Sequence, residues 1–347
     1  MISEIILKDV RKFKNKKIVI NSNRVILSGK NAVGKTTVLE AISLTSITKS
    51  HRTNNLKEII TEGSPFLDVT IKYDNKKYRI VVSNEGKMVS INNNEIKKLS
   101  DYIGEFIHVF FCPNDLEIIT SSPTLRRGFL NQEISQINSM YLNNLNIYNK
   151  LLSERNLMLK ELTLESDTVL LDVITSRLVE VGKKIIIERM KFIDEINNFV
   201  NEIHSKINSN EFIKLVYQPS TPLDKIEEIF KSKKNQDILS HQTNYGIQRD
   251  ELIFLLNDKN VSKFASQGQI RNVILSVKLA LCKVIYKYKG KHPVLLLDDV
   301  LSELDLTRQN ALLQLLDEYP NIQTIITTVD VNHLNLDTLK RFQIINL

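Results

Sequence analysis

Residues 29–36 read Gly-Lys-Asn-Ala-Val-Gly-Lys-Thr, a complete phosphate-binding loop. The apolar run 25–27 precedes this loop, and the helix-like run 37–42 follows it. Such a loop binds phosphate when a strand delivers it and a helix leaves it, because the backbone N–H groups then converge on an anion at the positive end of the helix. The alternative, an ordinary glycine-containing turn, is disfavoured because the chain has only 10 glycines. The sequence therefore predicts a nucleotide-binding α/β fold.

Each position of the loop has a predicted role toward ATP and Mg²⁺. Lys35 is expected to reach the β- and γ-phosphates, and the Thr36 hydroxyl is expected to bind Mg²⁺. Two glycines supply backbone dihedrals that a side chain would obstruct. The residues expected to surround the nucleotide here are Gly29, Lys30, Asn31, Ala32, Val33, Gly34, Lys35, Thr36 and Thr37.

The bulk properties are those of a globular protein. The 347 residues are enough for one large or two ordinary domains, with 42% hydrophobic and 25% charged residues. A net charge of +7 is compatible with a polyanionic partner, but a charge excess of this size is mainly relevant to solubility. Cys112 and Cys282 match no metal or redox spacing and are expected to be buried thiols in a reducing compartment. With no signal sequence and no apolar run near ~18 residues, we expect a cytoplasmic protein without a membrane partner.

The periodicity predicts two kinds of structure. Runs at 67–71 and 78–82 flank a turn at Asp74-Asn75 and predict an antiparallel β flap, at about 64–97, beside the nucleotide. Between Gly128 and Gly182 there is no Gly or Pro, and apolar residues recur at helical spacing. The predicted division is an ATPase lobe made of 1–130 and 211–347, with a helical subdomain at 131–210. The apolar stripe is read as a packed helix face without chemistry.

A second functional feature is the apolar run 294–297, which ends in Asp298-Asp299. A buried strand that ends in paired carboxylates is where phosphate-loop ATPases hold Mg²⁺ and activate water. Asp298 is predicted to be the metal-side carboxylate, and Asp299 the general base. Capping of the following helix is the alternative, and it suits one of the two but not both. The predicted catalytic residues are thus Asp299, Asp298 and Lys35, with Thr36 and Asp298 holding Mg²⁺.

The third feature is Ala-Ser-Gln-Gly-Gln at 265–269, before a helical stretch from 270 to about 288. This string resembles the signature sequence of ABC-type ATPases, and 302–305 resembles their D-loop. The resemblance implies that Ser266, Gly268 and Gln269 contact the γ-phosphate held by an opposite subunit. It implies a P-loop ABC-type ATPase head with the β flap and an inserted helical subdomain. ATP binding is then expected to drive formation of a homodimer.

Several further strings resemble segments of the bacterial RecF proteins, and the resemblance runs from Met1 to about Asp330. These strings are Ser50-His51-Arg52, 111–116, Ser122-Pro123, Arg126-Arg127, Phe129-Leu130, 245–250 and 264–305. The resemblance implies a recombinational repair factor that acts in DNA replication, DNA damage repair and the SOS response. Its implied partners are double-stranded and gapped DNA and the RecO and RecR proteins. It also implies dimerisation on ATP and slow, DNA-dependent ATP hydrolysis.

Some positions depart from the general ABC pattern. Asp299 stands where a Glu is usual, and Thr327-Thr328 where transporters use a switch histidine, so hydrolysis is expected to be slow. His333 comes several residues too late for that role and is read as a surface or packing histidine. The residue that senses the nucleotide from 110–131 is not identified, and Asn114 or Asp115 are substitutes.

Two basic clusters are candidates for a DNA-phosphate face. They are Arg11, Lys12, Lys14, Lys16 and Lys17 in one and Arg126 with Arg127 in the other. The alternative is an ordinary solvated surface, which is the more frequent role of a charge run.

Three other functions are weighed against the repair ATPase. A transporter subunit normally has the switch histidine and gives no place to the helical middle. An SMC-type ATPase needs hundreds of residues between the phosphate loop and the signature, whereas 134–207 allows only a short hairpin. A DNA-binding module that uses ATP only as a dimerisation ligand stays open.

Overall fold

The computed structural model describes residues 1–208, 210–302, 304, 306–329, 331 and 339–347. The chain divides into two compact units. The first comprises Met1–Asp115, Glu202–Asn210 and Ile274–Leu347, and the second comprises Leu116–Asn201 and Glu211–Val273. The second unit therefore includes most of the predicted helical subdomain together with flanking residues that the predicted division assigns to the ATPase lobe.

A five-stranded parallel sheet forms the centre of the first unit, in the order β14-β3-β13-β12-β8. Every residue of the four strands other than β14 is buried, which suits their continuous apolar and β-branched runs. The predicted strands before the phosphate loop and before the paired aspartates are thereby confirmed. The strands are β3 Arg24–Ser28, β8 His108–Phe111, β12 Val294–Leu297, β13 Thr324–Thr328 and β14 Gln343–Asn346.

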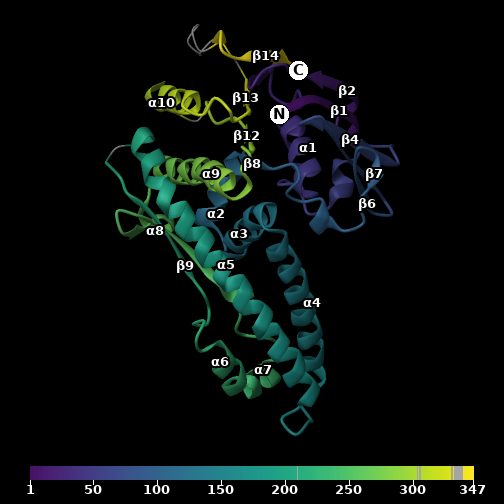
Figure 1. The fold of residues 1–347 in the computed structure, drawn as a ribbon, viewed down its shortest axis with the longest axis vertical. Helices are drawn as coiled ribbons and strands as arrows, with labels where there is room; N and C mark the ends of the chain where they lie inside the picture. The colour runs from purple at the N-terminus through teal and green to yellow at the C-terminus, as the bar shows by residue number, and fades with distance from the viewer. Residues whose placement is uncertain (209, 303, 305, 330, 332–338) are drawn as a thin grey trace. The chain divides into compact units, whose positions relative to one another are not determined.

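A six-stranded antiparallel sheet, β2-β1-β4-β5-β6-β7, forms the rest of the first unit's β structure (Figure 1). Asp74 and Asn75 both have positive φ, 46° and 62°, in the tight turn between β4 and β5. The predicted antiparallel flap is confirmed, and the N-terminal strands extend it. The strands are β1 Ile2–Val10, β2 Phe13–Val19, β4 Phe66–Tyr73, β5 Lys76–Ser83, β6 Lys87–Ile91 and β7 Asn94–Glu95.

Helix α1, Lys35–Ile47, lies between the two sheets and is buried on every side except at Thr36. Its buried side chains are partly polar, and its apolar residues Val38, Leu39, Ala41, Ile42 and Leu44 share one hydrophobic core with residues of both sheets. This packing holds the helix that follows the phosphate loop in a fixed place. The first unit also contains helix α10, Leu306–Asp317, and the 3₁₀ turns Leu56–Ile59, Leu99–Asp101 and Pro113–Asp115.

The second unit is mainly helical, as the sequence predicts, but it also holds a small antiparallel sheet, β11-β10-β9. A buried ion pair fastens its longest helix, since Arg189 Nη1 lies 2.7 Å from Asp250 Oδ2. The helices are α2 Leu116–Thr120, α3 Pro123–Ile137, α4 Ser139–Glu161, α5 Val169–Ile207, α6 Ile226–Ser232, α7 Lys234–Ser240, α8 Val261–Phe264 and α9 Gln267–Lys289. The strands are β9 Ile213–Gln218, β10 Glu251–Leu256 and β11 Lys259–Asn260, with a 3₁₀ turn at Ile247–Arg249.

Two of these helices belong to both units: α5 from Glu202 onward and α9 from Ile274 onward are part of the first unit. Over the described part of the chain, no helix is sufficiently long and apolar to span a membrane.

Candidate nucleotide-binding site

The phosphate loop has the backbone shape that its glycines predict. Gly34 has φ +102°, and a Cβ built there would lie 2.5 Å from the ring of Phe13. A side chain at this position would therefore clash with the aromatic ring as well as strain the backbone. The ring comes from the start of β2, so the β1–β2 hairpin packs closely against the phosphate loop.

Lys35 is buried and curls back over the loop. Its Nζ donates to the carbonyl oxygens of Gly29 at 2.6 Å and Lys30 at 3.0 Å. Burial lowers the pKa of the Lys35 ammonium, and the charges of Asp299 and Asp298 act against this shift. The ammonium group is thus held at the centre of the loop, where the sequence predicts contact with phosphate.

Two of the predicted metal ligands meet in the structure, although 262 positions separate them in the sequence. Thr36 Oγ1 donates to Asp298 Oδ1 at 3.1 Å. Thr327 Oγ1 donates to the same oxygen at 2.7 Å and accepts the backbone N–H of Asp299 at 2.8 Å. Burial raises the pKa of Asp298, while the hydrogen bonds from Thr327 and Thr36 counteract that rise. Thr327 thereby fixes both aspartates, a role that the sequence analysis missed.

Asp299 differs from Asp298 in its backbone conformation and in the hydrogen bonding of its carboxylate. Its backbone is left-handed, with φ 52°, and its Oδ1 is buried without a hydrogen-bond partner among the described residues. Aspartate and asparagine tolerate this backbone region better than other side chains with a Cβ. One carboxylate is therefore held by two hydroxyls, and the other has an acceptor oxygen left for a ligand or water.

These residues line a cleft of about 430 Å³, comparable with small-molecule sites in general. A hydroxyl and carboxylates are the hard oxygen ligands that Mg²⁺ prefers, and Mg²⁺ usually takes only one or two carboxylates from the protein and the rest from phosphates and water. The described residues hold no cluster of three or more His, Cys, Asp or Glu side chains that could bind a metal ion. The cleft is lined by Arg11, Lys12, Asn31, Ala32, Gly34, Lys35, Thr36, Thr37, Arg52, Asp298, Asp299, Thr327 and Val329.

A buried carboxylate on α1 organises one wall of this cleft. Glu40 is fully buried and accepts from Arg11 Nε and Nη2, both at 2.8 Å, and from Ser50 Oγ at 2.5 Å. Burial acts to raise the pKa of Glu40, but the hydrogen bonds from Arg11 and Ser50 outweigh it and hold the pKa below its ordinary value. Arg52 lies 3.7 Å from the same carboxylate. The guanidinium of Arg11 is therefore a structural part of the nucleotide cleft.

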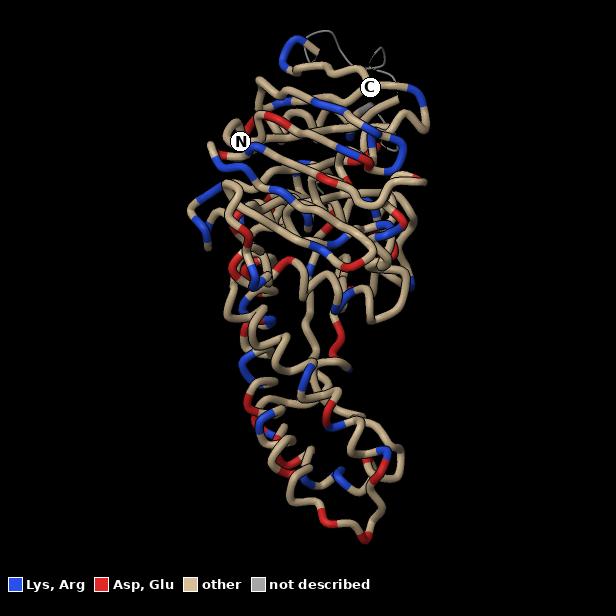
Figure 2. The backbone as a smooth tube through the Cα atoms, turned by 90° about the vertical axis from the view of Figure 1, so that its right-hand side faces the viewer, with Lys and Arg blue, Asp and Glu red and all other residues tan. Residues whose placement is uncertain are grey.

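Several side chains of the two basic clusters that are candidates for a DNA-phosphate face have partners within the protein. The carbonyl of Ala32 accepts from Lys12, and Lys17 pairs with Glu4 at 2.7 Å. In the second unit, Arg126 binds Glu251 through Nε and Nη2, at 2.6 Å and 3.0 Å. Arg126 is only 12% exposed and is therefore a poor candidate for a free phosphate-binding group, whereas Lys17 is 59% exposed. The contact of either cluster with DNA stays a prediction. Figure 2 shows Lys and Arg interspersed with Asp and Glu along the backbone.

His51 gives the first unit a measurable pH dependence. Its ring packs edge-on against Phe110, with centroids 4.4 Å apart, and burial lowers its pKa to about 4. An unfolded histidine titrates near 6.5, so between these values the unfolded state binds a proton that the folded state does not. The free energy of unfolding is therefore expected to fall as the pH drops from about 6.5 to 4, by at most about 3 kcal/mol from this residue.

Urea denaturation of the wild type and His51→Gln at pH 7.5 and 5 checks this expectation. The variant should lose less stability than the wild type over that interval, because it removes the proton that only the unfolded state binds. His241→Gln, at an exposed histidine that contacts the Leu159 carbonyl at 2.8 Å, is the control for removing a histidine, and the stability that it loses between the two pH values should match the loss of the wild type. Equal losses in His51→Gln and His241→Gln would contradict the role of burial.

The signature-like string lies in the second unit, at the start of α9. Ser266 Oγ accepts the Gln269 backbone N–H at 3.3 Å, while the Gln269 side chain accepts the Ser266 N–H at 2.9 Å. This reciprocal capping box fixes the helix start and leaves Ser266 exposed beside Gly268. The contact of these residues with a nucleotide stays a prediction. Of the D-loop-like run, Glu303 and Asp305 lie outside the described residues, as does His333.

The two candidates for a nucleotide-sensing residue are placed differently. Asp115 accepts the Cys112 N–H at 3.0 Å and lies 3.6 Å from the Lys278 ammonium, and burial raises its pKa. Asn114 is exposed. Neither lines the cleft, so their sensing role stays a prediction.

Comparisons with known proteins agree with this fold. The sequence matches the model of the RecF/RecN/SMC N-terminal domain family over residues 1–342. It is 39% identical over 328 residues to the DNA replication and repair protein RecF of Acholeplasma laidlawii (strain PG-8A), covering 94% of this chain and 93% of that protein.

Solved structures extend the likeness to three dimensions. The structure of the recombination mediator protein RecF-ATP, of the RecFOR pathway, matches with a TM-score of 0.89 at 29% identity, over 96% of this chain and 93% of that one. An SMC head domain from Pyrococcus furiosus shares the fold, with a TM-score of 0.57 at 18% identity, over 99% of this chain and 92% of that one. The predicted α/β ATPase head is thereby confirmed.

Proposed function

Because this chain belongs to the RecF family, we propose that it is an ATP-dependent DNA-binding protein of recombinational repair and replication-gap processing. The observation that carries the proposal is the meeting of Thr36 and Asp298, at 3.1 Å, in the cleft that also holds Lys35. This is the arrangement that a nucleotide with its metal ion needs. The relative solved with ATP supports the same ligand for this chain.

The proposed cycle follows from a site shared by two chains. ATP binds to the phosphate loop of one chain, and Ser266, Gly268 and Gln269 of a second chain close over its γ-phosphate. The resulting homodimer holds double-stranded or gapped DNA, and slow DNA-stimulated hydrolysis releases it. Since the ATP-bound relative acts in the RecFOR pathway, RecO and RecR are the proposed protein partners. The proposed setting is the cytoplasm during DNA replication and the SOS response.

The residues of the cleft have distinct proposed roles. Mg²⁺, held by Thr36 and Asp298, would neutralise phosphate charge when bound. Lys35 exchanges its hydrogen bonds to the loop carbonyls for bonds to phosphate oxygens. Thr327 keeps Asp298 ionisable and oriented, and Asp299 accepts a proton from water at the oxygen that has no internal partner.

Substituting the two aspartates separately tests this division. Asp299→Asn should bind ATP and Mg²⁺ but hydrolyse ATP at least about 100-fold more slowly, since a general base contributes typically 10²–10⁴-fold. Asparagine suits the left-handed backbone and Asp299 Oδ1 has no internal partner to lose among the described residues, so the fold should persist. Asp298→Asn should instead raise the Mg²⁺ concentration needed for turnover. Unchanged turnover of Asp299→Asn would place the base elsewhere.

The main alternative is a DNA-binding module that uses ATP only as a dimerisation ligand. It predicts no turnover, whereas the proposed cycle predicts slow turnover that duplex DNA accelerates. A transporter subunit predicts turnover that DNA leaves unchanged. Measuring ATP hydrolysis with and without duplex DNA therefore separates the three.

Binding of duplex DNA is the direct test of the proposed function. ATP should strengthen it, because a dimer doubles a net charge of +7 and joins two surfaces on one polyanion. Each neutralised phosphate contributes roughly −0.9 to the log–log salt slope, so we expect a slope of about −3 or steeper. Fluorescence anisotropy with labelled duplex at several salt concentrations measures both. DNA binding insensitive to ATP and to salt would contradict the proposal.

A further inference from the structure

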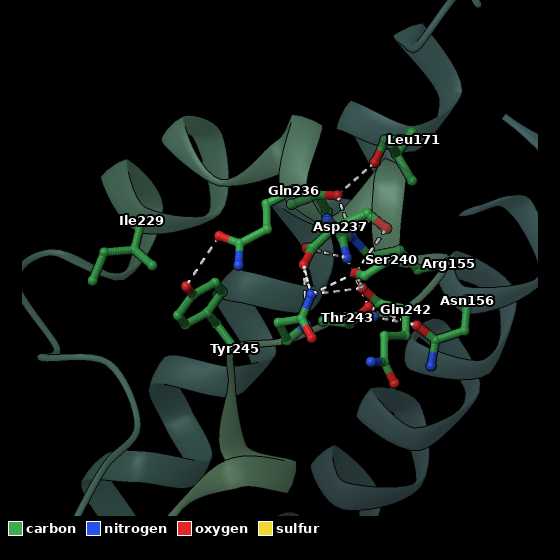
Figure 3. Close-up of polar contacts among 12 residues, drawn as sticks. Arg155, Asn156, Leu171, Ile229, Gln236, Asp237, Ser240, Gln242, Thr243 and Tyr245 are labelled. Atoms are coloured by element: carbon green, nitrogen blue, oxygen red, sulfur yellow. Dashed lines mark hydrogen bonds and ion pairs between the residues drawn. The ribbon is translucent and has the colours of Figure 1, made fainter. Parts of the chain in front are cut away.

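A charged cluster in the second unit is internal. Arg155, on α4, is fully buried and pairs with Asp237 of α7 at 2.9 Å. Its Nη1 also donates to Thr243 Oγ1 at 2.6 Å, and Figure 3 shows these three side chains gathered in one place. The cluster fastens α4 to α7 and offers no surface to a ligand.

The end of α9 in the first unit is the opposite case, because its charges are exposed. Residues 286–291 read Tyr-Lys-Tyr-Lys-Gly-Lys, and all six are exposed. The sequence has no Asp or Glu between Asp258 and Asp298, so no acidic residue of this segment offsets the lysines. Lys289 and Lys291 form no ion pair with a described residue. The α9-end patch is defined as Tyr286, Lys287, Lys289, Lys291 and His292.

The carboxylates at the margin of this patch are already paired. Three residues before Tyr286 on α9, Lys283 binds both carboxylate oxygens of Glu202 at 2.7 Å. The Lys283 ammonium also lies 5.4 Å from the ring centroid of Tyr319. The residue before that tyrosine, Glu318, pairs with Lys206. The patch therefore keeps a net positive charge, which favours an anionic ligand.

One aromatic ring of the patch is held flat against a histidine. The rings of Tyr286 and His292 have centroids 4.2 Å apart and lie only 9° from parallel. Gly290, with φ +64°, donates its N–H to the Tyr286 carbonyl at 2.8 Å, so the helix ends there and the chain turns back. Pro293 and the buried strand β12 follow at once and restrict the position of the histidine. Tyr286 is thus held in one orientation, and it remains 49% exposed.

An exposed, oriented ring among lysines fits a nucleic acid whose bases are unpaired. Proteins that bind single strands combine cationic side chains for the phosphates with aromatic side chains on which bases stack. In a duplex the bases stack on one another, so Tyr286 would have no base face to contact. An acidic protein segment would use the lysines but would leave the flat ring without a matching group. The patch therefore favours an unpaired strand over a duplex and over an acidic peptide.

The α9-end patch and the nucleotide cleft lie at opposite ends of one strand. His292 comes shortly before the amino end of β12, whereas Asp298 follows its carboxyl end. A strand of four residues spans about 13 Å. Variants of the patch are therefore expected to leave ATP binding unchanged.

We propose that the α9-end patch binds single-stranded nucleic acid. One base stacks on the exposed part of the Tyr286 ring, and Lys287, Lys289 and Lys291 bind the phosphates on either side of it. The inference deepens the proposed function and rests on it for the choice of DNA over RNA. In that setting, the patch holds the unpaired strand of a gap.

A labelled thymidine strand of about 16 nucleotides, within the usual site sizes, tests the proposal with the full-length chain and without ATP. We expect saturable binding by fluorescence anisotropy. An abasic strand of the same length and charge should bind at least about 5-fold more weakly, because one stacked base contributes about that much. A uridine RNA strand of the same length should bind no more tightly than the thymidine strand.

Substitutions of the two tyrosines test the stacking. Tyr286→Ala should weaken binding of the thymidine strand about 5-fold and leave binding of the abasic strand unchanged. Tyr286→Phe keeps a flat ring and should bind as the wild type. Tyr288→Ala is the matched control, because Tyr288 is 44% exposed but lies two residues further along α9 and so on its opposite side. This control should bind within about 2-fold of the wild type.

Substitutions of lysines test the phosphate contacts. Replacing Lys289 and Lys291 together by Gln should reduce the log–log salt slope by about 0.7 for each lysine. The control replaces Lys231 and Lys233, two exposed lysines of the second unit, and should leave the slope unchanged. ATP affinity should stay at the wild-type value in both double variants.

Several outcomes would overturn the proposal. These are no binding of the thymidine strand, equal binding of the thymidine and abasic strands, and equal effects of Tyr286→Ala and Tyr288→Ala. Tighter binding of a duplex at the patch would replace it with a duplex-binding face, and tighter binding of the RNA strand would remove the link to gapped DNA. ATP-dependent duplex binding is measured in parallel, and its absence would contradict the proposed function alone.

Discussion

Lys35→Met is expected to abolish tight ATP binding while the fold persists. The Lys35 ammonium is the one side-chain cation of the phosphate loop that the structure buries at the loop's centre. Charge-assisted hydrogen bonds to phosphate contribute about 3 kcal/mol, so the variant should bind ATP at least about 100-fold more weakly. Methionine has a similar length and an apolar body, which allows it to occupy the buried space.

Lys30→Met provides the matched control for this experiment. Lys30 lies in the same loop, but its side chain is exposed, and only its carbonyl oxygen contacts the Lys35 ammonium. Isothermal titration with ATP should show near wild-type affinity for Lys30→Met and none measurable for Lys35→Met. Circular dichroism and a thermal melt check the fold of each. An ATP affinity of Lys35→Met within about 3-fold of the wild type would refute the assignment of the phosphate site.

Ser266→Arg is expected to separate nucleotide binding from assembly. Each chain should still bind ATP, because Ser266 lies in the second unit and the phosphate loop in the first. The bulky arginine should prevent a second chain from closing over the γ-phosphate, so the ATP-dependent dimer should be lost. Light scattering with and without ATP measures the change. An undiminished dimer would mean that the site is not shared between two chains.

A second variant at this position separates the loss of the helix cap from the block to dimer formation. Ser266 Oγ caps α9, and losing a cap of this kind costs about 1 kcal/mol. Asparagine is as good a cap as serine and carries no charge, so Ser266→Asn should keep the helix start and much of the dimer. If Ser266→Asn and Ser266→Arg lose the dimer equally, the serine hydroxyl itself is required, which still places this residue at the interface.

The parts of the site whose signals lie in neighbouring residues could be predicted from the sequence. The phosphate loop needs a strand before it and a helix after it within about twenty residues, and these segments form as the patterns predict. The strand that ends in Asp298-Asp299 is apolar throughout, which is enough to place it inside a parallel sheet. The meeting of Thr36 with Asp298 then follows from the fold, because the phosphate loop that leads to Thr36 leaves the carboxyl end of β3 and Asp298 follows the carboxyl end of β12 in the same parallel sheet.

Long-range charge pairing could not be predicted in the same way. Arg11 reads as part of a basic run, but its partner Glu40 is defined only once β1 has packed beside α1. Arg126 likewise pairs with Glu251, 125 positions along the chain. In the sequence, Thr327 stands out only because it occupies the position where transporters use a switch histidine. Its two hydrogen bonds to the aspartates depend on the alignment of β13 with β12, which the sequence does not show.

The position of β3 in its sheet has a consequence for biosynthesis. The strand that carries the phosphate loop pairs on one side with β13 and on the other with β14, with Thr324 opposite Arg24 and Gln343 opposite Val25. A ribosome makes β3 early and both of its neighbours late. The nascent chain therefore carries β3 as an unpaired apolar strand until β13 and β14 have been made. Contacts between segments so distant in sequence form slowly. Nucleotide binding should thus be acquired only after β13 and β14 have been synthesised, so dependence on a chaperone should be greatest before that point.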